Sequence, residues 1–287
     1  SPCATVHRHR RRPDNVNTQQ TRWAWTAFGQ TDCGLVRPTN QDTYLVENRH
    51  RLWAVADGMG GHPGGDVASR LVMDSLEEHA PTLEGTASAS DLDEEERVTS
   101  RLTTLAEQAH ASILAHAAQH PPLHGMGTTL VMAHLLPRPK PRLLVVNIGD
   151  SRAYLVRAGT LTQLTRDHTL IDEYVRDGRL TPAQAARHPN RHVLTRAMGL
   201  ATHLESDLFS VDLLDGDLLL LCSDGLTKML TDERILQAVR PHQHIPSLAT
   251  QALIQRALDA GGIDNVTVVA CTITEIPESD KYPLTPT

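Results

Sequence analysis

The order in which strand-like and helical patterns follow one another along the 287 residues constrains the fold most strongly. Short apolar runs bounded by turn residues predict strands that come in groups. Apolar residues spaced three or four apart predict helices that come in adjacent pairs. A parallel sheet would instead need strands and helices in alternation. The order therefore favours an α+β fold, a four-layer α-β-β-α sandwich of two antiparallel β-sheets with a helix pair on each outer face.

The first half of the chain carries two groups of strands with the first helix pair between them. Apolar residues recur at helical spacing in residues 66–79, and a second apolar stripe predicts a helix from about residue 95 to 119, which a Pro-Pro pair ends. Residues 83–96 are small and acidic, so we expect a surface loop there. The strands of this half are predicted at residues 23–31, 43–47, 52–56, 128–135 and 143–148.

The second half carries a polar insert, residues 165–192, then strands, the second helix pair and a final strand. Within the insert, Thr181-Pro182-Ala183-Gln184 has the form of a capping box with proline at the first helical position. Helices are predicted from Thr231, as N-cap, and at about residues 247–260, before a Gly-Gly pair. The strands of this half are predicted at residues 153–157, 205–213, 218–222 and 265–274.

Composition narrows the class of protein. The chain is 40% hydrophobic and 21% charged, as in ordinary globular proteins, and its net charge of −7 argues against a nucleic-acid binder. No apolar stretch approaches the roughly 20 residues that cross a bilayer, and no signal-peptide segment is present, so we expect a cytoplasmic protein without membrane contact. The four cysteines are dispersed and no His-Glu-x-x-His pattern occurs, which argues against a disulfide framework, a catalytic cysteine and zinc.

The two ends of the chain differ in composition from the rest. Residues 1–21 contain a basic run and a polar Asn/Gln/Thr stretch, which predicts a disordered tail; a docking arm for an acidic partner is the alternative. Residues 276–287 form a Pro-containing C-terminal tail, so residues 22–275 are expected to be one domain. Because the sequence begins without Met, we expect it to start inside a longer reading frame or to be processed.

Four carboxylates stand where predicted strands meet turns: Asp42, Asp57, Asp224 and Asp264. Asp57 and Asp224 each follow an apolar run and precede a glycine, which lets backbone or ligand approach closely. A single Asp-Gly pair is a turn more often than a ligand. Four such carboxylates that converge from rigid strand ends would form an oxygen-rich site suited to hard divalent cations.

The residue types at these positions indicate the chemistry. Oxygen ligands without histidine or cysteine neighbours select Mg²⁺ or Mn²⁺ over zinc or copper. Two such ions about 3.5–4 Å apart suit phosphate-ester hydrolysis, because they lower the pKa of a bridging water and neutralise charge on the phosphoryl oxygens. The planar guanidinium of Arg37 can bind a phosphate through two hydrogen bonds, although a surface salt bridge is the alternative.

An ordered series of short motifs extends from about residue 26 to residue 273, nearly the whole chain except its tails. The motifs are residues 31–37 with Asn40-Gln41-Asp42, Asp57-Gly58-Met59-Gly60-Gly61, Gly127-Thr128-Thr129, residues 147–154, residues 164–168, His188-Pro189, residues 194–199, residues 223–227 and Asp264-Asn265-Val266-Thr267. This series is highly specific and resembles that of the metal-dependent protein phosphatases (PPM, or type-2C Ser/Thr phosphatases) of bacterial type.

The resemblance implies two metal positions. Asp57, Asp224 and Asp264 would hold one ion. Asp57, the carbonyl of Gly58 and, largely through waters, Asp42 would hold the other, so that Asp57 bridges both. The implied cofactors are therefore two Mn²⁺ or Mg²⁺ ions.

Two further residues receive roles from the resemblance. Asp150, in a Gly-Asp-Ser-Arg motif, matches the carboxylate that binds a weaker third metal together with Asp224 in bacterial relatives; a turn carboxylate that caps a strand end is the alternative. Arg37 matches the arginine that binds the substrate phosphate. Arg37 and the bridging Asp57 are thus the predicted catalytic residues.

The chain also departs from the family pattern. Animal and plant members carry a histidine, a proposed general acid, directly after the Asp-Gly pair, where this chain has Met59. His62 lies three residues further on, and we expect an ordinary loop histidine rather than a substitute acid. The insert at residues 165–192 corresponds to the family's flap, which influences substrate choice, or is a variable surface loop. It ends in Arg191-His192, where relatives commonly carry Arg-Asn.

The sequence therefore predicts a metal-dependent phosphatase that acts on phosphoserine and phosphothreonine in proteins without a covalent phosphoenzyme. We expect a monomer that opposes a bacterial Ser/Thr kinase, with the kinase and its substrates as partners. One alternative is a catalytically silent module that binds phosphoproteins, although the intact carboxylates and Arg37 argue against it. The other is a partner-switching phosphatase dedicated to one anti-sigma-antagonist-type protein.

Overall fold

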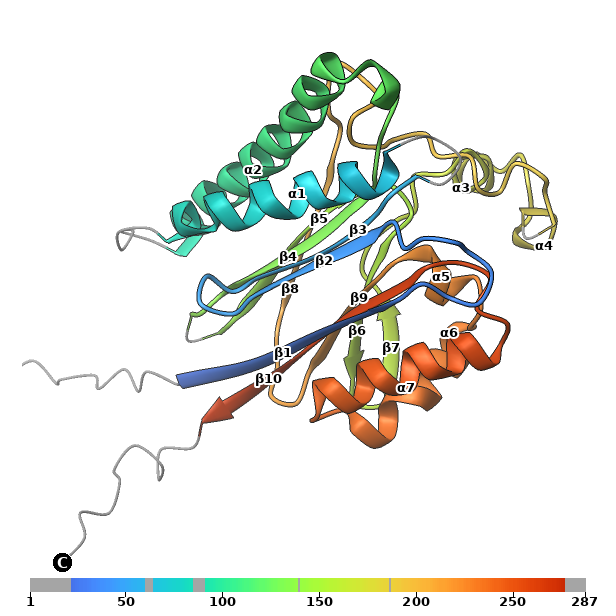
Figure 1. The fold of residues 1–287 in the computed structure, drawn as a ribbon. Coiled ribbons are helices and arrows are strands. Elements are labelled where there is room, and N and C mark those ends of the chain that lie inside the picture. The colour runs from blue at the N-terminus through green and yellow to red at the C-terminus, as the bar shows by residue number, and fades with distance from the viewer. Residues whose placement is uncertain (1–21, 60–63, 85–90, 139, 186, 277–287) are drawn as a thin grey trace, which may run out of the picture.

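The computed structural model describes residues 22–59, 64–84, 91–138, 140–185 and 187–276. Both predicted tails lie outside these ranges except for Ile276, which is the last residue of a strand rather than of a tail. Two five-stranded β-sheets stack face to face, and helices cover the outer face of each (Figure 1). Neighbouring strands are antiparallel throughout both sheets. This is the predicted four-layer α-β-β-α sandwich of the α+β class.

Each sheet combines strands from both halves of the chain. The first sheet has the order β1-β10-β9-β6-β7, and the second has the order β2-β3-β4-β5-β8. The strands are β1 Arg22–Asp32, β2 Asp42–Glu47, β3 Leu52–Asp57, β4 Leu130–Leu136, β5 Arg142–Ile148, β6 Arg152–Arg157, β7 Thr160–Gln163, β8 Asp207–Asp212, β9 Leu218–Cys222 and β10 Val266–Ile276.

Helices α1 and α2 cover the second sheet, whereas α6 and α7 cover the first (Figure 1). The α-helices are α1 Gly65–His79, α2 Asp91–Gln119, α3 Leu170–Arg176, α4 Pro182–Ala185, α5 Asp224–Thr227, α6 Asp232–Val239 and α7 Pro246–Asp259. Short 3₁₀ turns follow α1, α2 and α6 at Ala80–Leu83, Pro121–Leu123 and Arg240–His242.

The central strands are mostly apolar, as expected where both faces of a sheet are covered. In β3, Leu52 and Ala54 pack under α1 and α2, whereas Trp53 and Val55 pack between the two sheets. Successive strand residues point to opposite faces, so each face of β3 reaches a different apolar layer. A third layer lies between the first sheet and α6 and α7.

Local capping signals were predicted correctly. The Thr181 hydroxyl accepts a hydrogen bond from the backbone N–H of Gln184 at 3.3 Å, and the Gln184 side chain accepts one from the backbone N–H of Thr181 at 2.8 Å. This reciprocal pair is the capping box of α4. Thr231 is the N-cap of α6, and its hydroxyl accepts from the backbone N–H of Arg234.

The predicted surface loop at residues 83–96 was wrong in its second part, because α2 begins at Asp91. Acidic residues are favourable in the first turns of a helix, where they face the positive end of its dipole. The start of α2 is also held by tertiary ion pairs, from Arg138 to Glu94 at 3.3 Å and from Arg142 to Glu95 at 2.8 Å. The acidic residues that suggested a loop therefore belong to the first turns of α2.

Three short elements were missed by the sequence patterns: β7, α3 and α5. Each has seven residues or fewer, too short for a periodic pattern to appear. They matter for function, since α3 and α4 lie in the predicted flap and α5 begins at Asp224. No helix in the described part of the chain is both long and apolar enough to cross a membrane.

Candidate metal and phosphate site

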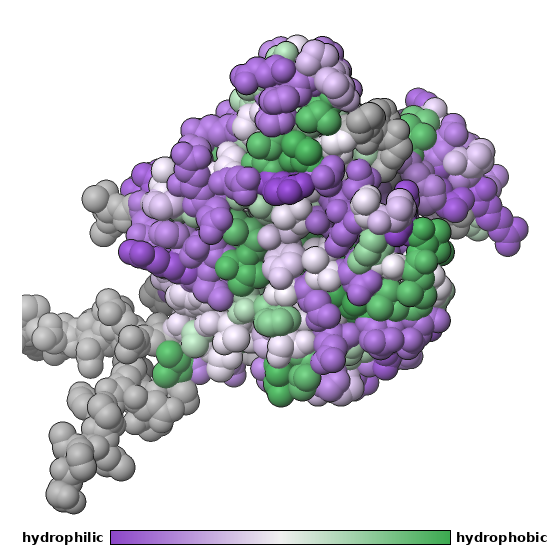
Figure 2. Space-filling view, viewed as in Figure 1, coloured by the Kyte–Doolittle hydropathy of each residue, from purple (hydrophilic) through white to green (hydrophobic). Residues whose placement is uncertain are grey.

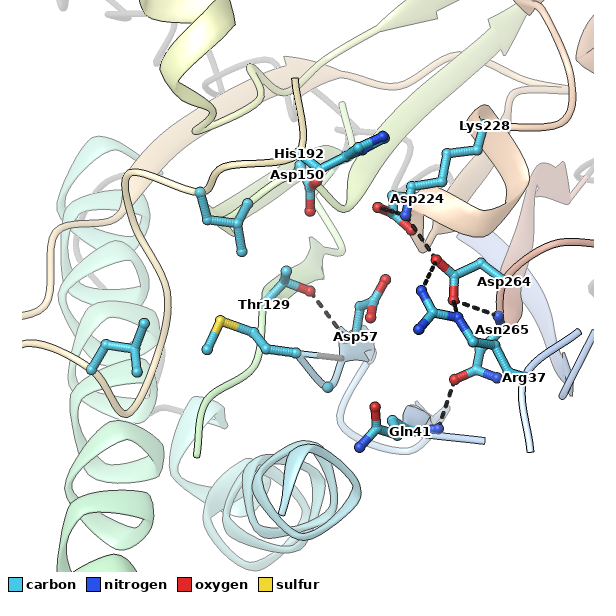
Figure 3. A pocket seen from close by; sticks show the side chains of 14 residues that line it. Arg37, Gln41, Asp57, Thr129, Asp150, His192, Asp224, Lys228, Asp264 and Asn265 are labelled. Atoms are coloured by element: carbon cyan, nitrogen blue, oxygen red, sulfur yellow. Dashed lines mark hydrogen bonds and ion pairs between the residues drawn. The ribbon is translucent and has the colours of Figure 1, made fainter. Parts of the chain in front are cut away.

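The predicted carboxylates meet at one end of the sandwich. Asp57 ends β3, Asp224 follows β9, and Asp264 lies two residues before β10. Asp150 lies in the short connection between β5 and β6. These strand ends lie at the same end of the two stacked sheets, so residues far apart in sequence face one cavity (Figure 3).

The cavity has a volume of about 340 Å³, and its lining includes Arg37, Asp57, Asp150, Asp224 and Asp264. A second, adjoining cavity of about 760 Å³ extends from Asp150, Asp224 and Asp264 towards the flap. The other side chains and glycines that line the first cavity are Gln41, Gly58, Met59, Thr129, His192, Leu194, Leu200, Lys228 and Asn265. Of the predicted site residues, Asp42 is the one that does not line it.

Asp42 is buried next to the cavity. It is the cross-strand partner of Asp57 in the β2–β3 pair, and its side chain accepts hydrogen bonds from the Ser223 and Thr267 hydroxyls, both at 2.7 Å. Its Oδ1 atom has no hydrogen-bond partner among the described residues. Burial raises the pKa of Asp42 to about 6, against the opposing effect of the two hydroxyls. Asp42 thus ties the second sheet to the first and leaves one oxygen without a partner.

Asp57 lies among several other carboxylates. Burial raises its pKa well above the ordinary value, and the charges of Asp42, Asp224 and Asp150 raise it further. Its backbone is held by Thr129, whose hydroxyl accepts from the Asp57 N–H at 3.0 Å and whose N–H donates to the Asp57 carbonyl at 2.9 Å. The strand end is therefore rigid, and its carboxylate faces like charges that a cation would offset.

Gly58 follows Asp57 in a place where only glycine fits. A Cβ atom there would overlap the carbonyl oxygens of Gly65 and Gln41. Its N–H donates to the carbonyl of Gln41 at 3.1 Å, which joins the end of β3 to the residue before β2. The close packing explains the Asp-Gly sequence physically.

Asp150 also has a perturbed carboxyl group. Burial raises its pKa to about 8, and the nearby charges of Asp224 and Asp167 act in the same direction. Asp150 and Asp57 therefore share one environment, in which several carboxylates lie close together and are poorly solvated.

Cations of the chain itself hold two of the carboxylates. The guanidinium of Arg37 forms a two-pronged pair with Asp264, with Nε 2.8 Å from Oδ1 and a terminal nitrogen donating to Oδ2 at 2.9 Å. The Lys228 ammonium contacts Asp224 and lies 2.8 Å from Oδ2 of Asp264. Burial opposes ionisation of Asp264, but these two cations together hold its pKa below the ordinary value.

Lys228 was missed by the sequence analysis. It lies four residues after Asp224, a spacing at which side chains on a helix are neighbours, and this was the signal that could have found it. The short helix α5 could not be recognised from the sequence, so the four-residue spacing could not be interpreted as a helical contact.

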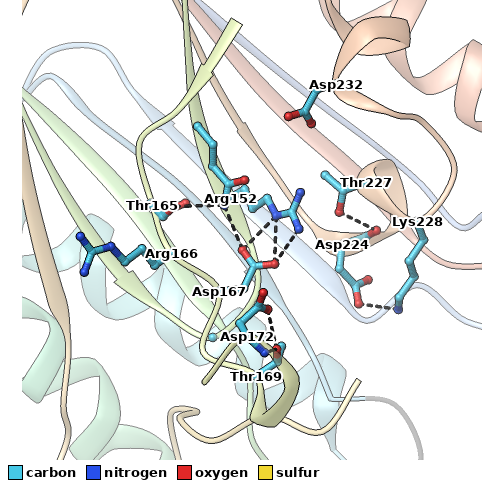
Figure 4. Close-up of polar contacts among 12 residues, drawn as sticks. Arg152, Thr165, Arg166, Asp167, Thr169, Asp172, Asp224, Thr227, Lys228 and Asp232 are labelled. Atoms are coloured by element: carbon cyan, nitrogen blue, oxygen red, sulfur yellow. Dashed lines mark hydrogen bonds and ion pairs between the residues drawn. The ribbon is translucent and has the colours of Figure 1, made fainter. Parts of the chain in front are cut away.

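The start of the flap is anchored beside the cavity by a charged pair (Figure 4). Arg152, on β6, donates to both oxygens of Asp167 at 2.7–3.0 Å. In the flap, the Thr169 hydroxyl caps α3 by accepting from the N–H of Asp172 at 3.1 Å. His192, at the end of the flap, lines both cavities, and burial together with the charges of Lys228 and Arg191 lowers its pKa.

The donor atoms fit a hard divalent cation. The cavity presents carboxylate oxygens without cysteine, and buried Oδ1 atoms of Asp42 and Asp224 have no hydrogen-bond partner among the described residues. Within the described ranges, no three His, Cys, Asp or Glu side chains form a ready metal-binding group. Arg37 and Lys228 instead occupy the carboxylates of Asp264 and Asp224, so these contacts would have to change when a cation binds.

A two-sheet sandwich with clustered carboxylates and an arginine guanidinium at one end matches the class of metal-dependent protein phosphatases. The model of the family described as protein phosphatase 2C matches residues 37–259. The chain belongs to this family and carries its phosphatase domain, which confirms the predicted family and fold.

Named relatives agree with this assignment. The chain is 39% identical over 260 residues to the serine/threonine protein phosphatase PstP of Mycobacterium tuberculosis, a match that covers 89% of this chain and 46% of the relative. The chain thus spans about half the length of that relative. It is 36% identical over 247 residues to the serine/threonine phosphatase stp of Listeria welshimeri, covering 84% of this chain and 92% of the relative.

A solved structure shares the architecture. The catalytic domain of the serine/threonine protein phosphatase PstP, in complex with two manganese ions, is 36% identical and superposes with a TM-score of 0.71. The match covers 88% of this chain and 99% of that one. The two-sheet fold described above is therefore that of a known protein phosphatase.

Proposed function

We propose that this chain hydrolyses phosphoserine and phosphothreonine esters on proteins with the help of two Mn²⁺ or Mg²⁺ ions. The observation that carries the proposal is the shared cavity, in which the Arg37 guanidinium lies against a cluster of four carboxylates, Asp57, Asp150, Asp224 and Asp264. The manganese in the related catalytic domain supports the choice of cofactor.

The proposed ligands follow from the positions of the side chains. Asp57, Asp224 and Asp264 would hold one ion, and Asp57, the Gly58 carbonyl and, through water, the free oxygen of Asp42 would hold the other. Asp150 with Asp224 would form a weaker third position. When bound, the ions lower the pKa of a water and offset charge on the phosphoryl oxygens.

Arg37 is proposed to orient the phosphoryl group. Its guanidinium has five N–H donors in a planar fork, and two nitrogens contact Asp264, so other donors remain for phosphate oxygens. Met59 lines the cavity and its thioether has no proton to give, so the proton for the leaving alkoxide has to come from another group or from water. His62, the nearest histidine in sequence, lies outside the described residues.

A protein substrate is supported by the surface beside Arg37. Leu35, Val36 and Ile263 are exposed to 69%, 65% and 48%. The N–H of Leu35 donates to the carbonyl of Gly262 at 2.7 Å, which joins the β1–β2 connection to the turn before β10. Figure 2 shows hydrophobic residues gathered over these two segments. An exposed apolar group of this kind suits contact with a polypeptide more than with a small phosphate ester.

The finer expectations about the whole protein belong to the same proposal. These are a monomeric cytoplasmic enzyme with no nucleic-acid partner, a cognate bacterial Ser/Thr kinase as partner, and one domain over residues 22–275 with a flap at residues 165–192. Substrate choice by the flap is supported by the wide cavity between Asp172, on α3, and the carboxylates.

The test compares the wild-type protein with Asp57→Asn and Asp224→Asn variants on p-nitrophenyl phosphate and on a phosphothreonine peptide, with Mn²⁺ and with EDTA. We expect turnover that needs the metal and falls by orders of magnitude in both variants, with unchanged circular dichroism. Turnover that persists in EDTA would refute the metal mechanism. Binding of the phosphopeptide without turnover would point to a silent binding module. Activity restricted to one phosphorylated antagonist protein would point to a partner-switching enzyme.

A further inference from the structure

Lys228 places a positive charge inside the carboxylate cluster. Its ammonium group contacts Asp224 and lies 2.8 Å from Oδ2 of Asp264, and its side chain is 20% exposed (Figures 3 and 4). It lines both the cavity at the carboxylates and the larger cavity next to the flap. Two of the three carboxylates proposed to hold one metal ion therefore already share a cation.

The backbone fixes this placement. Lys228 is the C-cap residue of α5, and its N–H donates to the carbonyl of Asp224 at 2.8 Å. The four-residue spacing brings the two side chains together on one side of the helical turn. Its ammonium is thus tethered next to Asp224, whereas the four-carbon stem lets it turn towards the open cavity.

Both oxygens of Asp264 are engaged by cations. Oδ1 contacts Nε of Arg37, and Oδ2 accepts from a terminal nitrogen of Arg37 and from Lys228. Asp224 differs, since its buried Oδ1 has no hydrogen-bond partner in the described part of the chain. Asp224 therefore keeps one oxygen that no described residue uses, whereas an incoming cation has to displace nitrogen contacts to share Asp264.

We propose that Lys228 is a tethered cation that competes with the divalent metal for Asp224 and Asp264 and thereby sets the affinity of that metal position. The inference rests on the proposed function, because it takes Asp224 and Asp264 as metal ligands. Like charges repel and a carboxylate oxygen has few lone pairs, so the metal binds only as the ammonium moves away. The chain would then need more free metal for occupancy than the same carboxylates would need without the lysine.

The test measures Mn²⁺ binding itself, by isothermal titration calorimetry and by the electron paramagnetic resonance signal of free Mn²⁺, at pH 8. Lys228→Met removes the charge and keeps most of the stem. We expect it to bind Mn²⁺ at least about tenfold more tightly, a change of about 1.4 kcal/mol. Lys228→Arg keeps the charge and should bind close to wild type. The matched control is Lys140→Met, which changes an exposed lysine between β4 and β5 and should leave binding unchanged.

A second pair of variants separates this inference from the proposed function. Asp224→Asn and Asp264→Asn should weaken Mn²⁺ binding. Wild-type affinity in both would overturn the ligand assignment. Weakened binding in both, with Lys228→Met equal to or weaker than wild type, would overturn the role of Lys228 alone. Circular dichroism checks the fold of each variant, and Lys228→Gln replaces Lys228→Met where the latter does not fold.

Discussion

His134 makes the stability of this fold depend on pH in a way that can be calculated. It lies in β4, paired with Leu52 on one side and Leu144 on the other, and is 1% exposed. Its Nδ1 atom has no hydrogen-bond partner among the described residues. Burial, together with the positive charge of Arg51, lowers the pKa of His134 from 6.5 to about 3. The folded protein therefore keeps this histidine neutral.

The direction of the effect follows from proton linkage. Since the pKa of His134 is lower in the folded state, the unfolded chain takes up the proton first as the pH falls. The contribution of the neutral histidine to the free energy of unfolding is therefore fully present above the unfolded pKa of 6.5. It is lost as the pH falls from 6.5 towards 3. At pH 5 the loss is about 1.5 pH units times 1.36 kcal/mol, or about 2 kcal/mol.

The perturbation that tests this is His134→Leu, which removes the titrating group from the same buried position. Urea unfolding at pH 7.5 and pH 5, in EDTA so that metal binding does not contribute, gives the free energy of unfolding of each protein. We expect wild type to lose about 2 kcal/mol more than the variant between the two pH values. The control is His124→Gln, which removes an exposed histidine and should behave as wild type. Equal pH dependence in wild type and His134→Leu would refute the reasoning.

Other perturbations report on the site. Asp57→Asn should lower the phosphopeptide turnover number by orders of magnitude with an unchanged far-UV spectrum; normal turnover would remove its bridging role. Arg37→Met should lower kcat/KM for a phosphopeptide roughly 10- to 100-fold, because a charge-assisted phosphate contact is lost, and steady-state kinetics would show an unchanged value if Arg37 only forms a salt bridge. Arg152→Met should destabilise the fold by about 2–3 kcal/mol in thermal unfolding, because Asp167 is left without its partner; restoration of part of this loss by Asp167→Asn in the double variant is the check. Gly58→Ala should lower Tm and weaken Mn²⁺ binding, because its Cβ has no room; a variant with wild-type Tm would contradict the close packing.

Much of the fold could be predicted because its signals are local. The apolar run of β3 and the N-cap at Thr231 each depend on residues within a few positions, and both were found in the structure. The charged start of α2 was not predicted, since its ion pairs come from Arg138 and Arg142, more than forty residues away. Short elements such as β7 escaped for a related reason, because hydrogen bonds to β6 rather than sequence periodicity hold them in place.

The site could be predicted in its residue types but not in its contacts. The cavity brings together Arg37, Asp57, Asp150, Asp224 and Asp264 as the motif order predicted. Each of these carboxylates ends, follows or precedes a strand. In an antiparallel sheet the end of one strand lies next to the start of its neighbour. The pattern therefore carried enough information to place them near each other.

The sequence by itself determined the layer order, the family and the set of candidate metal ligands, because strand periodicity, helix caps and motif order are properties of neighbouring residues. Only the tertiary structure decided how the charges are partnered. It placed Asp42 against the hydroxyls of Ser223 and Thr267 from the opposite sheet, and it placed the Lys228 ammonium between Asp224 and Asp264. Electrostatic partners are chosen by distance in space, and residues 36 to 225 positions apart become neighbours only when strands pair within a sheet and the two sheets pack.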